Sequence, residues 1–130
     1  MKLAQSLTLL TSASFNILSV LANFYIIQGE KSLLACPQDR LCDCAFNGTD
    51  AGQIYGNDSN HGLGGSILFM PPGFCGSTDS LGFLKEGDSW EIYANEHLQG
   101  TCVSDSTLRL CPIYSHSVKA LFRCDSQICS

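Results

Sequence analysis

Basic residues are scarce in this 130-residue chain, which has seven lysines and arginines against twelve aspartates and glutamates. They form no cluster, so the chain offers no basic surface for nucleic acid or for an anionic membrane. Sustained helical periodicity is absent as well, because no stretch repeats apolar side chains at helical spacing over several turns. These absences exclude a nucleic-acid-binding protein and a helical bundle. What is left is room for one small domain built from short strands.

The N-terminal segment lacks charge almost completely, since Lys2 is the only charged residue among the first 29. An apolar stretch follows it, and the small residues Val20 and Ala22 occupy the positions minus three and minus one of a cleavage site. We predict a signal peptide over residues 1–22, cut after Ala22 or later, near Gly29, and therefore a secreted protein. A membrane anchor is the alternative, because apolar residues continue past the expected cleavage site.

Eight cysteines lie beyond residue 35. An even number at this density indicates an oxidising compartment and up to four disulfides, with about a hundred possible pairings that the sequence alone does not rank. The pair Cys42 and Cys44 does not match zinc-site spacing, so structural disulfides are favoured over metal. Two glycosylation sequons, at Asn47 and Asn57, indicate the same compartment. The eight residues expected in disulfides are Cys36, Cys42, Cys44, Cys75, Cys102, Cys111, Cys124 and Cys129.

Composition divides the mature chain into a polar, cysteine-rich N-terminal arm over residues 23–51 and a domain over residues 52–130. Once Lys2 is lost with the leader, six basic and twelve acidic residues give a formal charge of −6. In the domain, short apolar runs alternate with turns rich in Gly, Pro, Asn and Asp, which predicts an antiparallel β-sandwich. The expected strands are residues 53–56, 66–70, 81–84, 89–94, 101–104, 108–110 and 117–123.

A pattern repeats within this domain. Ile-Tyr, a small residue and Asn occur around Tyr55 and again around Tyr93, and each copy continues with Leu-x-Gly, a cysteine and a serine that precedes apolar residues. The offset between copies is 38 residues at the tyrosines, 36 at the cysteines and 37 at the serines. A nearly constant offset predicts one domain of two related units, over about residues 52–85 and 88–124.

The second unit, with Tyr93, Leu98, Gly100 and Ser117, resembles the βγ-crystallin Greek-key motif. In that family an aromatic residue packs beside a folded hairpin, a glycine takes a positive φ, and a later serine hydrogen-bonds back to the hairpin. The resemblance implies a disulfide-stabilised sandwich of two Greek-key motifs. The positions expected to carry these roles are Tyr55, Gly65 and Ser80 in the first unit and Tyr93, Gly100 and Ser117 in the second.

The family's calcium positions carry no paired carboxylates here, so we expect no bound calcium. The histidines His61, His97 and His116 fit turn or surface roles better than catalysis, and no nucleophile motif surrounds Ser117. We therefore predict no enzyme, no metal and no cofactor. Trp90 is expected to anchor the core, and the remaining carboxylates are expected on a solvated face: Glu86, Asp88, Glu91 and Glu96.

Small secreted proteins of the family that this chain resembles look like killer toxins, like cysteine-rich fungal effectors and like a bacterial metalloproteinase inhibitor. The first hypothesis is accordingly a monomeric, non-enzymatic effector or toxin-like protein that binds an extracellular protein or glycan. The alternative is an inhibitor of a secreted protease, and a hydrolase is least favoured. The run from Ile67 to Met70 is expected as a buried strand stopped by proline; if exposed, it would be a hydrophobic contact surface.

Overall fold

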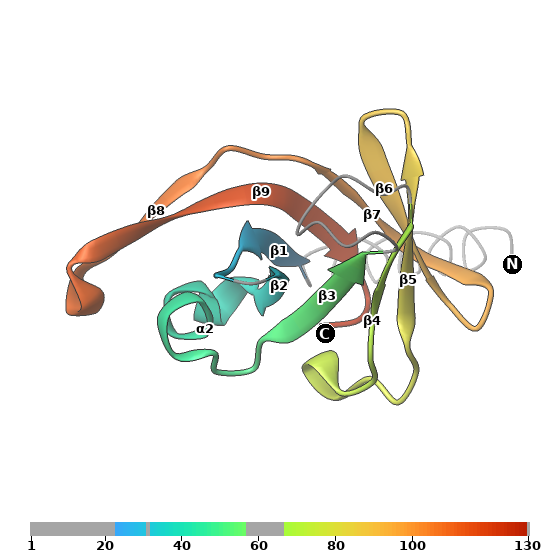
Figure 1. Cartoon of the computed structure of the whole chain (residues 1–130), viewed down its shortest axis with the longest axis horizontal. Coiled ribbons are helices and arrows are strands. Elements are labelled where there is room, and N and C mark those ends of the chain that lie inside the picture. Colours follow the sequence, from blue (N-terminus) through green and yellow to red (C-terminus); the bar gives the residue numbers. More distant parts are fainter. Residues whose placement is uncertain (1–22, 31, 57–66, 130) are drawn as a thin grey trace, which may run out of the picture.

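The computed structural model describes residues 23–30, 32–56 and 67–129 (Figure 1). The expected signal peptide, Asn57, His61 and Gly65 lie outside these residues. The described chain is antiparallel and mainly β, with one α-helix and three short 3-10 helices. The strands are β1 (Asn23–Gln28), β2 (Leu33–Pro37), β3 (Gly52–Gly56), β4 (Ile67–Met70), β5 (Leu81–Glu86), β6 (Ser89–Ala94), β7 (His97–Ser104), β8 (Leu108–Cys111) and β9 (His116–Ser126). The helices are η1 (Gln38–Arg40), α2 (Leu41–Asn47), η2 (Phe74–Gly76) and η3 (Pro112–Tyr114).

The sheet closes on itself as an eight-stranded barrel. Strands β1 to β7 pair with their neighbours in sequence order, and β9 lies between β7 and β1. A closed sheet has no free edge among its members, so every barrel strand is paired on both sides. Strand β8 pairs with β9 beyond the barrel, in line with β7. We call residues 108–119 the arm; in Figure 1 it extends from the barrel and curves over α2.

This strand order corrects the expected sandwich of two Greek-key motifs, because a meander that closes through its last strand replaces the two sheets. All seven expected strands are present, most of them longer than the sequence indicated. Residues 23–51 were expected as an arm outside the domain, but they supply β1, β2 and α2. Both repeated units end with a 3-10 turn beside a cysteine and a returning strand, but two strands, β3 and β4, precede the turn in the first unit and three strands, β6 to β8, precede it in the second.

The main core fills the barrel with side chains from all eight of its strands. Alternate residues of each strand point inward, as the period of two requires. Trp90 is 2% exposed, which confirms its expected role as a core anchor. Burial of a side chain of this kind contributes about 1.5–3 kcal/mol or more. The largest fully buried side chains of this core are Trp90, Phe24, Phe83, Ile26, Leu33, Leu68, Met70, Leu81 and Ile92.

A smaller second core lies between α2, β1 and the arm. Tyr25 and Ile27 of β1 point into it, while Phe24 and Ile26 of the same strand point into the barrel. Strand β1 is therefore covered on both faces. This core also includes Val118 and Ala120 of β9 and Leu41 of α2, and three of its eight buried residues are half-cystines.

All eight expected cysteines form disulfides. Cys36–Cys44 joins β2 to α2, and Cys42–Cys111 joins α2 to the end of β8. Cys75–Cys129 joins η2 to the C-terminal segment, and Cys102–Cys124 links the paired strands β7 and β9 within the main core. Two of the bonds therefore hold the barrel, and two hold the helix and the arm to each other and to the barrel.

The hairpin between β6 and β7 corrects the role expected for Gly100. Positive φ angles occur at Asn95 (50°) and Glu96 (66°), which make the two-residue turn, and Gly100 is not among the positive-φ glycines. Gly100 is constrained by space instead, because a Cβ there would overlap the Asp125 carbonyl oxygen on β9. Ser117 lies on the arm opposite Leu110, at the other end of the molecule from this hairpin (Figure 1), so it does not bond back to it.

Candidate binding surface

The outward face of strands β3 to β7 carries large apolar side chains in register. Strand β4 alternates strictly: Leu68 and Met70 are buried, while Ile67 (48% exposed) and Phe69 (50% exposed) face solvent. The run expected to be buried is therefore half exposed. Its outward residues continue into neighbouring strands to form what we call the outer face: Tyr55, Ile67, Phe69, Leu84, Tyr93 and Leu98.

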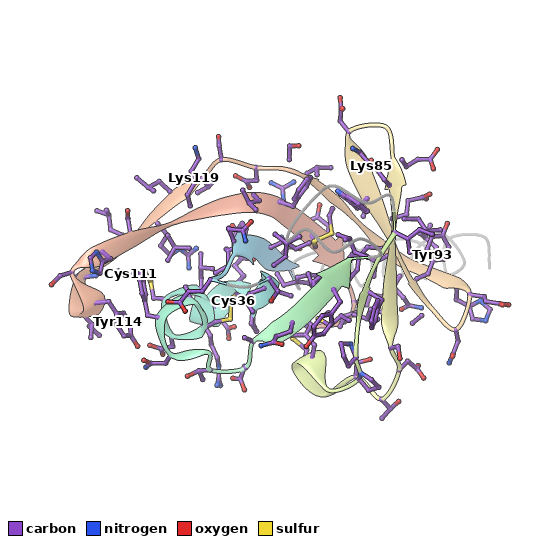
Figure 2. All side chains as sticks on the ribbon, viewed as in Figure 1. Cys36, Lys85, Tyr93, Cys111, Tyr114 and Lys119 are labelled. Carbon is purple, nitrogen blue, oxygen red and sulfur yellow. A yellow bond between two sulfur atoms is a disulfide. The ribbon has the colours of Figure 1, made fainter. Side chains whose placement is uncertain are left out.

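One cross-strand row runs through this face. Tyr55 pairs with Phe69, Phe69 with Gly82, Gly82 with Tyr93, and Tyr93 with Leu98. Side chains of paired residues lie on the same side of a sheet, and neighbouring strands are about 4.8 Å apart. The row therefore places aromatic rings on both sides of a glycine. Figure 2 shows Tyr93 on the side of β6 that faces away from the interior.

Hydroxyl groups of both tyrosines reach a polar side chain two residues earlier on the same strand. Tyr55 Oη donates to Gln53 Oε1 at 2.6 Å, and Tyr93 Oη lies 3.5 Å from Glu91 Oε1. The pKa of Tyr93 is raised, first by partial burial and then by the neighbouring Glu91 carboxylate. The Tyr55 and Phe69 ring centroids are 5.5 Å apart with the planes tilted by 32°.

The glycine in the row has no conformational need to be glycine. Gly82 is not among the positive-φ residues, and a Cβ built there meets no atom within 4 Å. A glycine inside a strand weakens it and often marks a place where another molecule approaches the backbone closely. Between Phe69 and Tyr93 the outer face thus has a notch one strand wide, with backbone as its floor. We call it the Gly82 notch.

The arm carries a second set of exposed apolar residues. Leu108, Leu110 and Ile113 are 60%, 73% and 90% exposed. Ile113 lies in η3 at the end of the hairpin, directly after Cys111, whose disulfide to Cys42 fixes this end to α2. Figure 2 shows Lys119 on the outward side of the arm and Cys111 on the side of α2.

Aromatic side chains and polar groups hold the hairpin end against α2. The Phe46 ring stacks on Tyr114, with centroids 4.9 Å apart, and His116 stacks on the same phenylalanine at 5.8 Å. Tyr114 Oη donates to Asp43 Oδ1 at 2.7 Å and accepts from Asn47 Nδ2 at 2.8 Å. The hydrogen bond to Asp43 is the main cause that raises the pKa of Tyr114.

The positions expected from the sequence separate into different environments. Tyr55 and Tyr93 both lie on the outer face, separated by Phe69 and Gly82, instead of filling a corner between sheets. Ser80 is exposed directly before β5, and His97 is exposed at the start of β7. Asn47 is exposed at the end of α2, where a sequon is accessible, although glycosylation itself stays a prediction. The carboxylates expected on a solvated face are all surface residues, with Glu91 half-buried and the others exposed: Glu86, Asp88, Glu91 and Glu96.

The sequence did carry a signal for the outer face. A strand whose outward and inward positions are both apolar, such as Ile-Leu-Phe-Met in β4, indicates a second covered or contacting surface. The Gly82 notch gave no such signal, because an isolated glycine in a strand is common and its neighbours across the sheet depend on register. The stack of Phe46 and Tyr114 was missed as well, because these residues are 68 positions apart in sequence.

Other parts of the described structure offer no comparable candidate site. A surface pocket of about 380 Å³ between the β2–α2 region and η2 contains Arg40 and Asp50, but these two groups are paired with each other at 2.6 Å. Within residues 23–30, 32–56 and 67–129, no three histidine, cysteine, aspartate or glutamate residues lie close enough to hold a metal ion. No helix in this part of the chain is both long and apolar enough to cross a membrane.

Comparisons with protein-family models, with curated proteins and with solved structures find no match to this chain. The functional argument therefore rests on the residues and their geometry.

Proposed function

We propose that this chain is a secreted, non-enzymatic, effector- or toxin-like protein that binds an extracellular target through its outer face. One observation carries the proposal: six large apolar or aromatic side chains lie together on a sheet surface that is not needed to close the barrel. Contiguous apolar patches on a small soluble protein mark interaction sites. Four disulfides in a chain of this size are compatible with the extracellular space.

The position of β1 bears on how the precursor is processed. Because β1 pairs with both β2 and β9, a cut near Gly29 would remove the strand that closes the barrel. A cut after Ala22 leaves β1 intact. We therefore expect the secreted protein to begin at Asn23 with all eight cysteines oxidised, as mass spectrometry of the unreduced protein would establish. A retained leader or free thiols would contradict secretion through this route.

The binding test compares two surface variants of the secreted protein. Phe69→Ser with Leu84→Ser removes apolar contacts from the outer face, whereas Leu108→Ser with Leu110→Ser makes the same change on the arm, where both leucines are exposed. We expect the wild type and the arm variant to be retained on isolated extracellular material and the outer-face variant to be released. Equal retention of both variants would mean that the outer face is not the contact surface.

The protease-inhibitor hypothesis is supported by a different observation, the position of Ile113. This residue is 90% exposed on a hairpin end fixed by the Cys42–Cys111 disulfide. Inhibitors of this kind present a rigid loop to the protease, and rigidity lowers the entropic cost of binding. The hairpin end is a 3-10 turn closed by Ser115 with φ 57°, not an extended segment. A stable complex with a secreted protease that Ile113→Ala abolishes would establish this function in place of the first.

The resemblance of the repeated units to βγ-crystallin motifs is also a proposal. It is supported by the 3-10 turn beside a cysteine and the returning strand that end both units, whereas the additional strand β8 and the meander arrangement limit any relationship to these elements.

A further inference from the structure

The Gly82 notch defines what the outer face can hold. Its two walls are Phe69 and Tyr93, each one strand away from the glycine, and Tyr55 continues the row beyond Phe69. A ligand that lies across the strands therefore meets an aromatic ring, an open backbone floor and a second ring in succession. The space above Gly82 is open, because a Cβ built there meets no atom within 4 Å.

The two tyrosine side chains lie along their own strands. A tyrosine whose hydroxyl reaches the residue two positions back on the same strand leans along that strand, and both Tyr55 and Tyr93 do so. Tyr55 is 41% exposed and Tyr93 is half-buried, so both residues keep some surface open to solvent. Ring faces are electron-rich and pack against flat groups with polarised C–H bonds. The hydroxyls and their partners, Gln53 and Glu91, add hydrogen-bond acceptors at the edge of the same platform.

The charged side chains near the outer face indicate which charge a ligand that stacks on the aromatic rings can carry. Nucleic-acid bases also stack on aromatic side chains, but their binding needs a basic groove for the backbone. The described charged side chains on β5, β6 and the turns beside them are Lys85 against four acids: Glu86, Asp88, Glu91 and Glu96. This excess of negative charge repels acidic ligands and attracts amines, and it does not oppose the binding of neutral polyols. An amine would also gain from the electron-rich rings by cation–π attraction.

We propose that the Gly82 notch and its flanking rings form a site for a glycan chain of neutral or amine-bearing sugars, with one sugar ring on the notch and its neighbours on Phe69 and Tyr93. A pyranose ring has an apolar C–H face for the rings and hydroxyls at its edge for Tyr55, Gln53 and Glu91. The site rests on the proposed function, since it specifies the extracellular target as carbohydrate and the outer face as the place that binds it.

The test fills the notch without disturbing the fold. Gly82→Val adds a side chain in open space at a strand position, where valine is favoured, so thermal unfolding should show equal or higher stability. Ser117→Val is the matched control, because Ser117 is an exposed strand residue on the arm. Calorimetric titration would use soluble chains of β-linked glucose, of N-acetylhexosamine and of free-amine hexosamine, and an acidic polygalacturonate fragment.

We expect the wild type and Ser117→Val to bind at least one non-acidic chain and not polygalacturonate, and Gly82→Val to bind at least about tenfold more weakly. Equal binding by Gly82→Val, equal binding of polygalacturonate, or binding of an oligoproline peptide in place of the glycans would overturn the site. If no glycan binds, retention of the protein on extracellular material is compared before and after the material is treated with protease. This comparison shows whether only the glycan site or also the proposed binding function is wrong. Retention that protease abolishes would leave a protein-binding function and remove the glycan, whereas no retention on untreated material would remove both.

Discussion

The barrel and the arm region bury their apolar residues by different means. The barrel core takes side chains from all eight strands that surround it, and it is closed on every side by paired backbone. The second core, under the arm, is smaller; three of its eight buried residues are half-cystines, and its cover is a two-stranded ribbon with one short helix. A core of that size rarely holds a segment in place by itself, and small secreted domains commonly use disulfides at such places. The barrel should thus depend mainly on packing, with two disulfides in addition, and the arm mainly on the disulfide Cys42–Cys111.

The largest expected effect is in the barrel. Trp90→Ala removes the largest fully buried side chain and leaves a cavity that eight paired strands cannot collapse around, so we expect a loss of about 3–5 kcal/mol in unfolding free energy. Denaturant unfolding followed by circular dichroism would measure it. Leu110→Ala on the arm, 73% exposed, should change stability by less than about 0.5 kcal/mol. A small effect of Trp90→Ala would contradict a packed barrel.

Cutting the link between α2 and the arm should be next in size. The double variant Cys42→Ser with Cys111→Ser removes a disulfide that spans 69 residues, for which about 2–4 kcal/mol is typical. The location of the effect distinguishes the two regions: amide hydrogen exchange should accelerate in residues 108–119 and change little in β5 and β6. Equal acceleration in β5 and β6 would show that the two cores unfold as one unit.

The same comparison explains what the sequence revealed. Strands exposed on one face, such as β6 with Trp90 inward and Glu91 outward, alternate and were predicted with their correct bounds. Strand β1 is covered by the barrel on one face and by the second core on the other, so Phe24 to Ile27 reads as an unbroken apolar run. This run directly continues the apolar residues of the expected signal peptide, so residues 23–28 were assigned to the N-terminal segment 23–51 and not to a strand of the domain.

Disulfide pairing and the binding surface depend on register between distant segments, which no local pattern contains. Gly100 and Gly82 illustrate this limit. Both are strand glycines, yet one lies against the backbone of β9 and the other faces open space. The motif resemblance identified Gly100 as necessary but assigned the need to its φ angle, because contact with β9 follows only from the closed strand order.

The third prediction compares the effect of alanine on stability at these two glycines, which both lie in barrel strands. Gly100→Ala forces a Cβ against the Asp125 carbonyl oxygen and Ser126, so the strands β7 and β9 must separate locally. We expect a loss of about 1–3 kcal/mol, typical of overpacking. Gly82→Ala meets no atom within 4 Å and should be neutral or stabilising. Melting temperatures of the pair would check this, and equal values would argue against the pairing of β7 with β9.

The smallest effect concerns the hydrogen bonds that hold the hairpin end to α2. Tyr114→Phe keeps the stack on Phe46 but removes the hydroxyl that Asp43 accepts, so its melting temperature at neutral pH should fall by less than that of Gly100→Ala. The pKa of Tyr114 is raised by the folded structure, so its contribution is complete below the unfolded tyrosine pKa of about 10 and is lost as pH rises above that value. The difference between wild type and Tyr114→Phe should therefore shrink between neutral and strongly alkaline pH.

Asp43→Asn, which keeps an acceptor but removes the charge that opposes ionisation of the hydroxyl, should reduce this alkaline loss. A difference between wild type and Tyr114→Phe that stays constant with pH would mean that the Asp43 bond does not hold the arm, leaving the disulfide and the aromatic stack as its attachment.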